Sequence, residues 1–137
     1  MTEILARGLQ ERGHDVAVFG YPGGMLEERM RGVAPFEPIL KGMDFNPPVV
    51  MRAVSALRKH RAEIVVTMMK KDVTMTGPAA AMLGVPVVVR HANQQPLGHN
   101  VFWRLLYGYL PDLHVANAEA TRRTLLASAR WLGEDQV

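Results

Sequence analysis

The sequence predicts an α/β domain in which helices cover both faces of a mainly parallel sheet. Helix-like and strand-like stretches alternate along the 137 residues, an order typical of parallel strands joined by crossover helices. The clearest stretch, residues 80–91, reads as a helix end, a turn and a buried strand. Gly84 permits the left-handed conformation that ends a helix, and Pro86 cannot continue one. The β-branched run Val87 to Val89 lacks alternation, as expected of a strand covered on both faces.

The first half of the chain predicts two helices and two strands. An amphipathic stripe opens the sequence and ends at Gly13, so the chain starts inside a helix. A strand is expected at 15–19, a turn at 21–24 and a weak strand near 38–40. Asn46 is a good N-cap for the second helix, because its side-chain oxygen can accept a hydrogen bond from an unpaired backbone N–H. Three cations complement the dipole at the last turn of that helix: Arg58, Lys59 and Arg61.

The second half predicts three further pairs of strand and helix. The expected strands are 64–67, 87–89 and 113–116. A helix should begin at Thr76 or Gly77, with Pro78 at its first position, and run to Leu83. Two more helices are expected at 100–109 and 119–128, the former burying Phe102, Leu106 and Tyr109.

Composition narrows the classes of function. The formal charge is +3 and the pI about 9.6, but acidic residues are mixed in throughout. This balance suits phosphate-bearing or anionic small ligands, and we expect no nucleic-acid partner. The absence of cysteine excludes disulfides and thiolate metal sites, and fits a reducing compartment. The longest uncharged stretch, residues 73–89, is broken by glycine and proline and cannot be a single transmembrane helix.

Several motifs that carry chemistry are missing from the sequence. Neither G-x-G-x-x-G nor G-x-x-x-x-G-K-[ST] occurs, so the usual dinucleotide and P-loop fingerprints are absent. No Asp-x-Asp pair is available to hold Mg²⁺ on a sugar nucleotide, and the five histidines lack close metal-ligand spacing. We therefore expect neither a metal nor a cofactor.

Candidate site residues follow the strands, because ligands of open α/β sheets bind beyond the carboxyl ends of the strands. His91 follows the strand 87–89, where an imidazole titrating near neutral pH could donate to a sugar oxygen or to developing negative charge. The alternative is a histidine that only bonds a neighbouring loop. The other candidates are polar groups that suit an anionic or hydroxylated ligand, or else solvated loops: Lys70, Lys71, Asp72, Arg90, Asn93, Gln94 and Gln95.

Four segments, in their order and spacing, resemble the N-terminal half of a GT-B glycosyltransferase of family 4. They are residues 5–16, 63–67, 77–86 and 115–122, which span nearly the whole chain. The resemblance implies a Rossmann-like three-layer domain on the acceptor side of a retaining enzyme. It also implies that His91 is catalytic, near the transferred sugar and the acceptor hydroxyl. Asn117 and Glu119 would bind the acceptor, although Ala118 replaces a serine that relatives often carry between them.

The sequence also departs from the family pattern. Relatives open with a strand and a glycine-rich loop, and continue into a second Rossmann-like domain that binds the sugar nucleotide. We therefore expect residues 1–137 to be a partial N-terminal domain that lacks its first strand and the donor domain, and that is inactive alone. Loss of a central strand predicts direct pairing of its neighbours, pairing with another molecule, or marginal stability.

The resemblance implies two partners, a nucleotide-sugar donor and a glycan, lipid or small-molecule acceptor. The expected location is the cytoplasm or the inner face of the membrane, because cations on the helix after Asn46 could face anionic lipid. Two alternatives remain open. One is another GT-B sugar-nucleotide enzyme, such as an epimerase, and the other is a non-catalytic flavodoxin-like binding domain.

Overall fold

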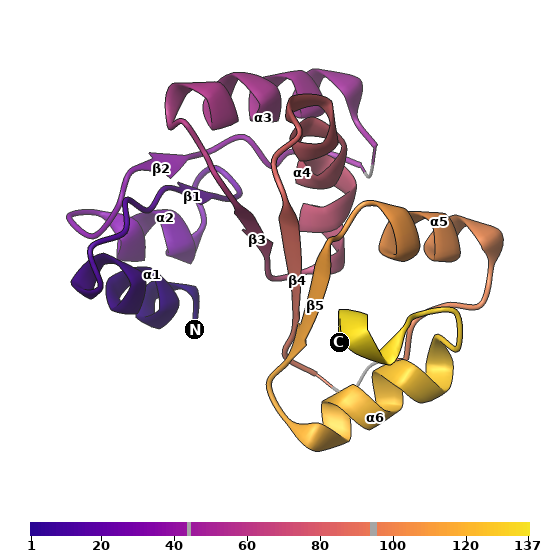
Figure 1. The fold of residues 1–137 in the computed structure, drawn as a ribbon. Coiled ribbons are helices and arrows are strands. Elements are labelled where there is room, and N and C mark those ends of the chain that lie inside the picture. Colours follow the sequence, from indigo (N-terminus) through magenta and orange to yellow (C-terminus); the bar gives the residue numbers. More distant parts are fainter. Residues whose placement is uncertain (44, 94–95) are drawn as a thin grey trace.

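The computed structural model describes residues 1–43, 45–93 and 96–137. Figure 1 shows helices packed around short parallel strands. The helices are α1 (Thr2–Glu11), α2 (Met25–Met30), α3 (Pro47–Lys59), α4 (Lys70–Leu83), α5 (Val101–Tyr109) and α6 (Glu119–Ser128), followed by the 3-10 turn η1 (Glu134–Gln136). The strands are β1 (Val18–Phe19), β2 (Phe36–Glu37), β3 (Val65–Thr67), β4 (Val87–His91) and β5 (Leu113–Ala116).

The strands form two parallel sheets, β1-β2 and β3-β4-β5. In the larger sheet, Val66 lies beside Val88, and His91 lies beside Ala116. The carboxyl ends of β3, β4 and β5 therefore meet at one edge, from which α4 and α6 begin. This arrangement confirms the predicted Rossmann-like α/β class with parallel strands.

The turn between α4 and β4 forms as predicted. Gly84 ends α4 with φ of +66°, and its N–H donates to the carbonyl oxygen of Ala81. A side chain at this left-handed position would be strained, which explains the glycine. The strand that follows is two residues longer than predicted, because Arg90 and His91 also pair with β5. His91 is therefore held by a strand and not by a loop.

The start of α4 differs most from the prediction. The helix begins at Lys70 instead of Thr76 or Gly77, so Pro78 lies inside it. Asp72 caps the true start, because its Oδ2 accepts from the backbone N–H groups of Met68 and Met69 at 3.1 and 3.0 Å. Burial outweighs the helix-breaking tendency of proline here, since the apolar side chains on both sides of Pro78 are fully buried: Val73, Met75, Ala79 and Ala80.

Other predictions need smaller corrections. The strand expected at 15–19 is confined to Val18–Phe19, and the weak strand expected at 38–40 lies at Phe36–Glu37. The sequence did not predict α2. The buried face of α5 is made by Leu106 and Tyr107, whereas Phe102 and Tyr109 are exposed. The buried face of α5 is therefore rotated relative to the predicted one, so that Tyr107 lies in the core.

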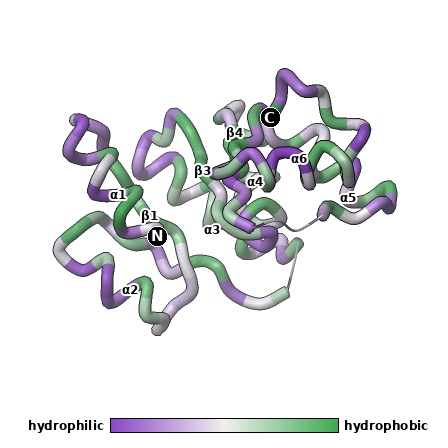
Figure 2. The backbone as a smooth tube through the Cα atoms, turned by 90° about the horizontal axis from the view of Figure 1, so that it is seen from below, coloured by the Kyte–Doolittle hydropathy of each residue, from purple (hydrophilic) through white to green (hydrophobic). Residues whose placement is uncertain are grey.

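The larger hydrophobic core lies between the three-stranded sheet and helices α3, α4, α5 and α6, and a smaller one joins α1, β1 and α2. Hydrophobic and hydrophilic stretches alternate along the chain in Figure 2. Within the described part of the chain, no helix combines the length and the apolar character that spanning a membrane requires.

A gap separates β1 from β3 in Figure 1. Among the described residues, no strand pairs with the second edge of either one. The N–H of Val65 donates to the carbonyl oxygen of Pro86, so by alternation the backbone of Val66 faces the gap. The side chain of Val66 is 40% exposed, although it lies in a strand. Direct pairing of β1 with β3, one of the three outcomes predicted from the sequence, is not seen in the described part of the chain.

Hydrogen exchange tests whether this gap is open. The amide of Val66 should exchange faster than the amide of Val65, because only Val65 has a partner across the sheet. A strand that paired with this edge of β3 should protect Val66. NMR detection resolves the two neighbours in one sample. Equal protection of both amides in the 137-residue chain would contradict an open edge.

Candidate functional site

His91, the predicted catalytic residue, ends β4 and is half-buried beside β5. Its Nε2 atom lies 3.0 Å from Nδ1 of His114. The two rings stack with centroids 5.2 Å apart and an interplanar angle of 27°. Because the strands are parallel and in register, β4 and β5 bring both side chains to the same face of the sheet.

His114 anchors this pair to α5. It is only 2% exposed, and its Nε2 atom lies 2.9 Å from the carbonyl oxygen of Tyr107. The ring of Tyr107 packs on both histidines, with centroids 6.3 Å from His91 and 6.2 Å from His114. The position of His91 is therefore defined by three elements, β4, β5 and α5.

Trp103 and Lys70 extend the cluster toward solvent. The Trp103 ring lies 5.8 Å from that of Tyr107, and Nζ of Lys70 lies 5.3 Å from the Trp103 centroid. Lys70 is the first residue of α4, so the positive end of that helix adds to its charge. A cation, an indole and an imidazole thus stand together beyond the sheet, a combination that suits a hydroxylated or anionic ligand. We call Lys70, His91, Trp103, Tyr107 and His114 the His91 cluster.

Burial keeps both histidines neutral. It lowers the pKa of His91 to about 4, with smaller contributions from Lys70 and from His114, because a positive charge on either side chain would oppose a cationic His91 ring. Burial also lowers the pKa of His114, although the hydrogen bond to Tyr107 acts in the opposite direction. The expectation that His91 titrates near neutral pH is therefore corrected. At pH 7 the ring is a neutral imidazole.

Asp72 was a candidate for acceptor binding, but its carboxylate is engaged at the start of α4 with the N–H groups of Met68 and Met69. Burial raises its pKa, and those two hydrogen bonds counteract the rise only in part. The geometry thus assigns Asp72 a structural role at the N-terminus of α4.

The remaining candidates are not all brought together. Arg90 precedes His91 in β4 and, by alternation, lies on the opposite face of the sheet. Lys71 and Asn93 are exposed near the same edge of the sheet as His91. Gln94 and Gln95 lie outside the described residues.

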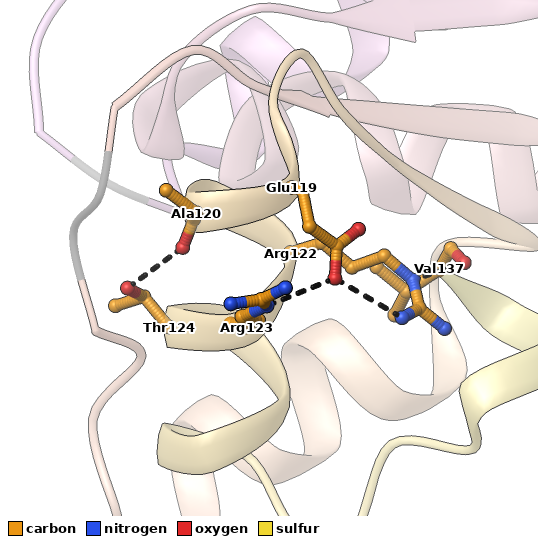
Figure 3. Close-up of polar contacts among 6 residues, drawn as sticks. All are labelled: Glu119, Ala120, Arg122, Arg123, Thr124 and Val137. Carbon is orange, nitrogen blue, oxygen red and sulfur yellow. Dashed lines mark hydrogen bonds and ion pairs between the residues drawn. The ribbon is translucent and has the colours of Figure 1, made fainter.

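Asn117 and Glu119 lie beyond the end of β5. Asn117 joins the ends of two strands, because its Nδ2 donates to the carbonyl oxygen of Ala92 at 3.2 Å. The carboxylate of Glu119 instead pairs within α6, with Arg123 at 3.1 Å and Arg122 at 3.9 Å (Figure 3). These pairs reduce the charge that Glu119 presents to an acceptor.

Sequence reasoning missed Trp103, Tyr107 and His114. Trp103 and Tyr107 are four residues apart and so share a face of α5, which is the signal that could have found them. His114 lies in a predicted strand, and a histidine among apolar residues there could have marked a buried polar contact. No group of three potential metal ligands occurs among the described residues.

A shallow groove of about 360 Å³ lies elsewhere, between β2 and α3. Its lining includes Glu37, Arg52 and Lys59, and Glu37 is bonded to Lys59 and His60 at 2.6 and 2.8 Å. These bonds lower the pKa of Glu37. Because the carboxylate is already paired, the groove does not compete with the His91 cluster as a candidate site.

The fold is similar to parts of two solved structures. The chain is similar to MurG of Acinetobacter baumannii, with a TM-score of 0.66 and 20% identity over 87% of this chain and 37% of that one. It is also similar to a putative UDP-N-acetylglucosamine 2-epimerase from Listeria monocytogenes, with a TM-score of 0.69 and 14% identity over 98% of this chain and 39% of that one. The chain thus spans less than two fifths of either protein.

The parallel sheet and these likenesses define a Rossmann-like domain of the GT-B class. The sequence matches the Glycosyltransferase Family 4 domain over residues 1–130. The chain therefore belongs to glycosyltransferase family 4. A comparison with curated proteins finds no match.

Proposed function

We propose that this chain is the acceptor-side part of a retaining glycosyltransferase. The complete enzyme would transfer a sugar from a nucleotide-sugar donor to a glycan, lipid or small-molecule acceptor. The observation that carries this proposal is the placement of His91 at the carboxyl end of β4, where ligands of α/β sheets bind. Membership of glycosyltransferase family 4 supports sugar transfer as the chemistry of this site.

In this proposal the His91 cluster positions the acceptor. The half-buried imidazole bonds the reacting hydroxyl, and the exposed face beyond it holds the rest of the molecule through Lys70, Lys71 and Asn93. Arg90, Gln94, Asn117 and Glu119 stay proposals as acceptor contacts. Catalysis would be mainly positional and electrostatic in a cleft closed by the donor domain.

The donor would be held mainly by a second domain outside residues 1–137. Calorimetry on this chain should therefore detect no tight binding of sugar nucleotides, whereas a longer protein with the second domain should bind its donor. The two titrations use the same panel of nucleotide sugars. Micromolar affinity in the 137-residue chain would contradict the proposal that a second domain holds the donor.

A second candidate function is that of a GT-B sugar-nucleotide enzyme of another type, such as an epimerase. The likeness to the putative epimerase extends over 98% of this chain, which keeps this candidate open. The two candidates differ in their products, because an epimerase changes the nucleotide sugar and a transferase extends an acceptor.

We also propose a peripheral membrane contact at the cytoplasmic face. Apolar side chains are exposed on α5, where Phe102 also meets Phe45 with centroids 5.3 Å apart. Arg52 and Arg58 are exposed on α3, while Lys59 is paired with Glu37. Sedimentation with vesicles should show binding to anionic lipid and not to neutral lipid. Equal recovery with both vesicles, or with neither, would count against this contact.

A further inference from the structure

The hydrogen bonds of His114 determine which of its nitrogens carries a proton. A backbone carbonyl can only accept, so the contact of 2.9 Å between Nε2 of His114 and the oxygen of Tyr107 requires a proton on Nε2. His114 is 2% exposed, and burial disfavours its charged form. Its Nδ1 atom is therefore unprotonated and accepts a hydrogen bond.

This assignment extends to His91. Because Nδ1 of His114 accepts, the contact of 3.0 Å requires that Nε2 of His91 donates. A neutral imidazole has one N–H, so Nδ1 of His91 carries a lone pair and no proton. Within the part of the chain that the structure describes, no group donates to that atom.

We propose that His114 is a positioning residue that fixes the tautomer and ring orientation of His91, so that His91 offers Nδ1 as a hydrogen-bond acceptor to a substrate hydroxyl. The role at the substrate rests on the proposed function, whereas the tautomer does not. The carbonyl group of Tyr107 in α5 sets the direction of both hydrogen bonds, because it can only accept from His114. A hydroxyl is the fitting ligand, because it can donate to Nδ1 and leave its oxygen free to react.

Stacking alone would not require this order. The rings of His91, His114 and Tyr107 lie within 6.3 Å of one another and would pack whichever nitrogen carried the proton. A purely structural His114 would therefore be replaced by an aromatic ring without effect on the tautomer of His91. If His114 positions His91, the same replacement should change the tautomer of His91.

Two substitutions separate the hydrogen bonds of His114. The amide of His114→Asn reaches the former position of Nδ1 and can accept from His91, whereas the amide of His114→Gln reaches the position of Nε2 and can bond only Tyr107. His114→Phe keeps an aromatic ring without either hydrogen bond. His14→Ala is the matched control, because His14 is exposed in the turn after α1.

Long-range ¹H–¹⁵N NMR of the 137-residue chain at pH 7 reads these tautomers directly. We expect His91 and His114 to be protonated on Nε2 in the wild type and in His14→Ala. His114→Asn should keep the His91 tautomer, while His114→Gln and His114→Phe should give His91 signals averaged between two tautomers. In a protein with measurable transfer, His114→Gln should lower kcat by roughly 10- to 100-fold with little change in KM, and His114→Asn should restore most of it.

Protonation of His91 on Nδ1 in the wild type would overturn the proposal, and so would a single unchanged tautomer in His114→Gln. The wild-type spectrum decides the matter even if the variants unfold. The spectra are recorded without substrate, so they test the positioning role separately from the transfer reaction. A correct tautomer in a protein without transferase activity would refute the proposed function and leave the role of His114 intact.

Discussion

In the two-domain glycosyltransferase that we propose, replacing His91 with alanine should lower turnover by roughly ten- to a thousandfold, the range expected when one positioned acid/base or electrostatic contact is lost. The physical reason is its place at the end of β4, where the ring is fixed by His114 and α5. Steady-state kinetics on a protein that contains both domains measures the effect. Circular dichroism should show that the fold survives, because the ring is only half-buried.

The matched control for this variant is His14→Ala. His14 is exposed and precedes β1, at the opposite end of the strands from the His91 cluster. Its removal should leave turnover unchanged. Wild-type turnover in both variants would make His91 a structural residue, while equal loss in both would show that the effect is not specific to the site.

Acid should destabilise the chain between pH 6.5 and 4. In the unfolded chain His91 gains its proton near its ordinary pKa of 6.5, whereas in the folded protein its pKa is about 4. The unfolded state therefore binds more protons in this window, and the free energy of unfolding falls as the pH drops through it. Because His91 is only half-buried, solvent screening makes this loss smaller than the full pKa difference would give. His114 acts in the same direction, because its pKa is also lowered.

Urea titrations at several pH values measure this loss. His91→Asn should flatten the dependence, because an amide stays neutral throughout the window. Asp72 opposes the trend at the acid end, since burial raises its pKa and favours protonation in the folded state. A free energy of unfolding that is constant from pH 6.5 to 4.5 would contradict the neutral, half-buried His91 described above.

The parts of the fold that follow local rules could be predicted from the sequence. Gly84 and Pro86 mark the end of α4, and the β-branched run after them forms a parallel strand as expected. The start of α4 could not be predicted in this way. Pro78 suggests a first turn, but burial of the surrounding side chains and the cap from Asp72 extend the helix to Lys70. Tertiary packing decides such boundaries, and single-sequence rules do not contain it.

In the candidate site, too, some features follow from the local sequence and others depend on tertiary packing. The position of His91 could be predicted, because the strand 87–89 delivers it to the edge of the sheet where ligands bind, whereas its catalytic role stays a prediction. Its surroundings could not, because Tyr107 and His114 reach it from a helix and another strand, and their rotation decides the contact. Asp72 and Glu119 were predicted as ligand groups from their places in the sequence, yet both are engaged in local bonds.

Product analysis on a protein that contains both domains tests the central claim most directly. The protein would be incubated with labelled nucleotide sugars and a panel of glycan, lipid and small-molecule acceptors, and the products separated and their linkage determined by NMR. We predict a covalently extended acceptor whose new bond keeps the anomeric configuration of the donor. An epimerised nucleotide sugar with no extended acceptor, or donor binding without any turnover, would contradict it.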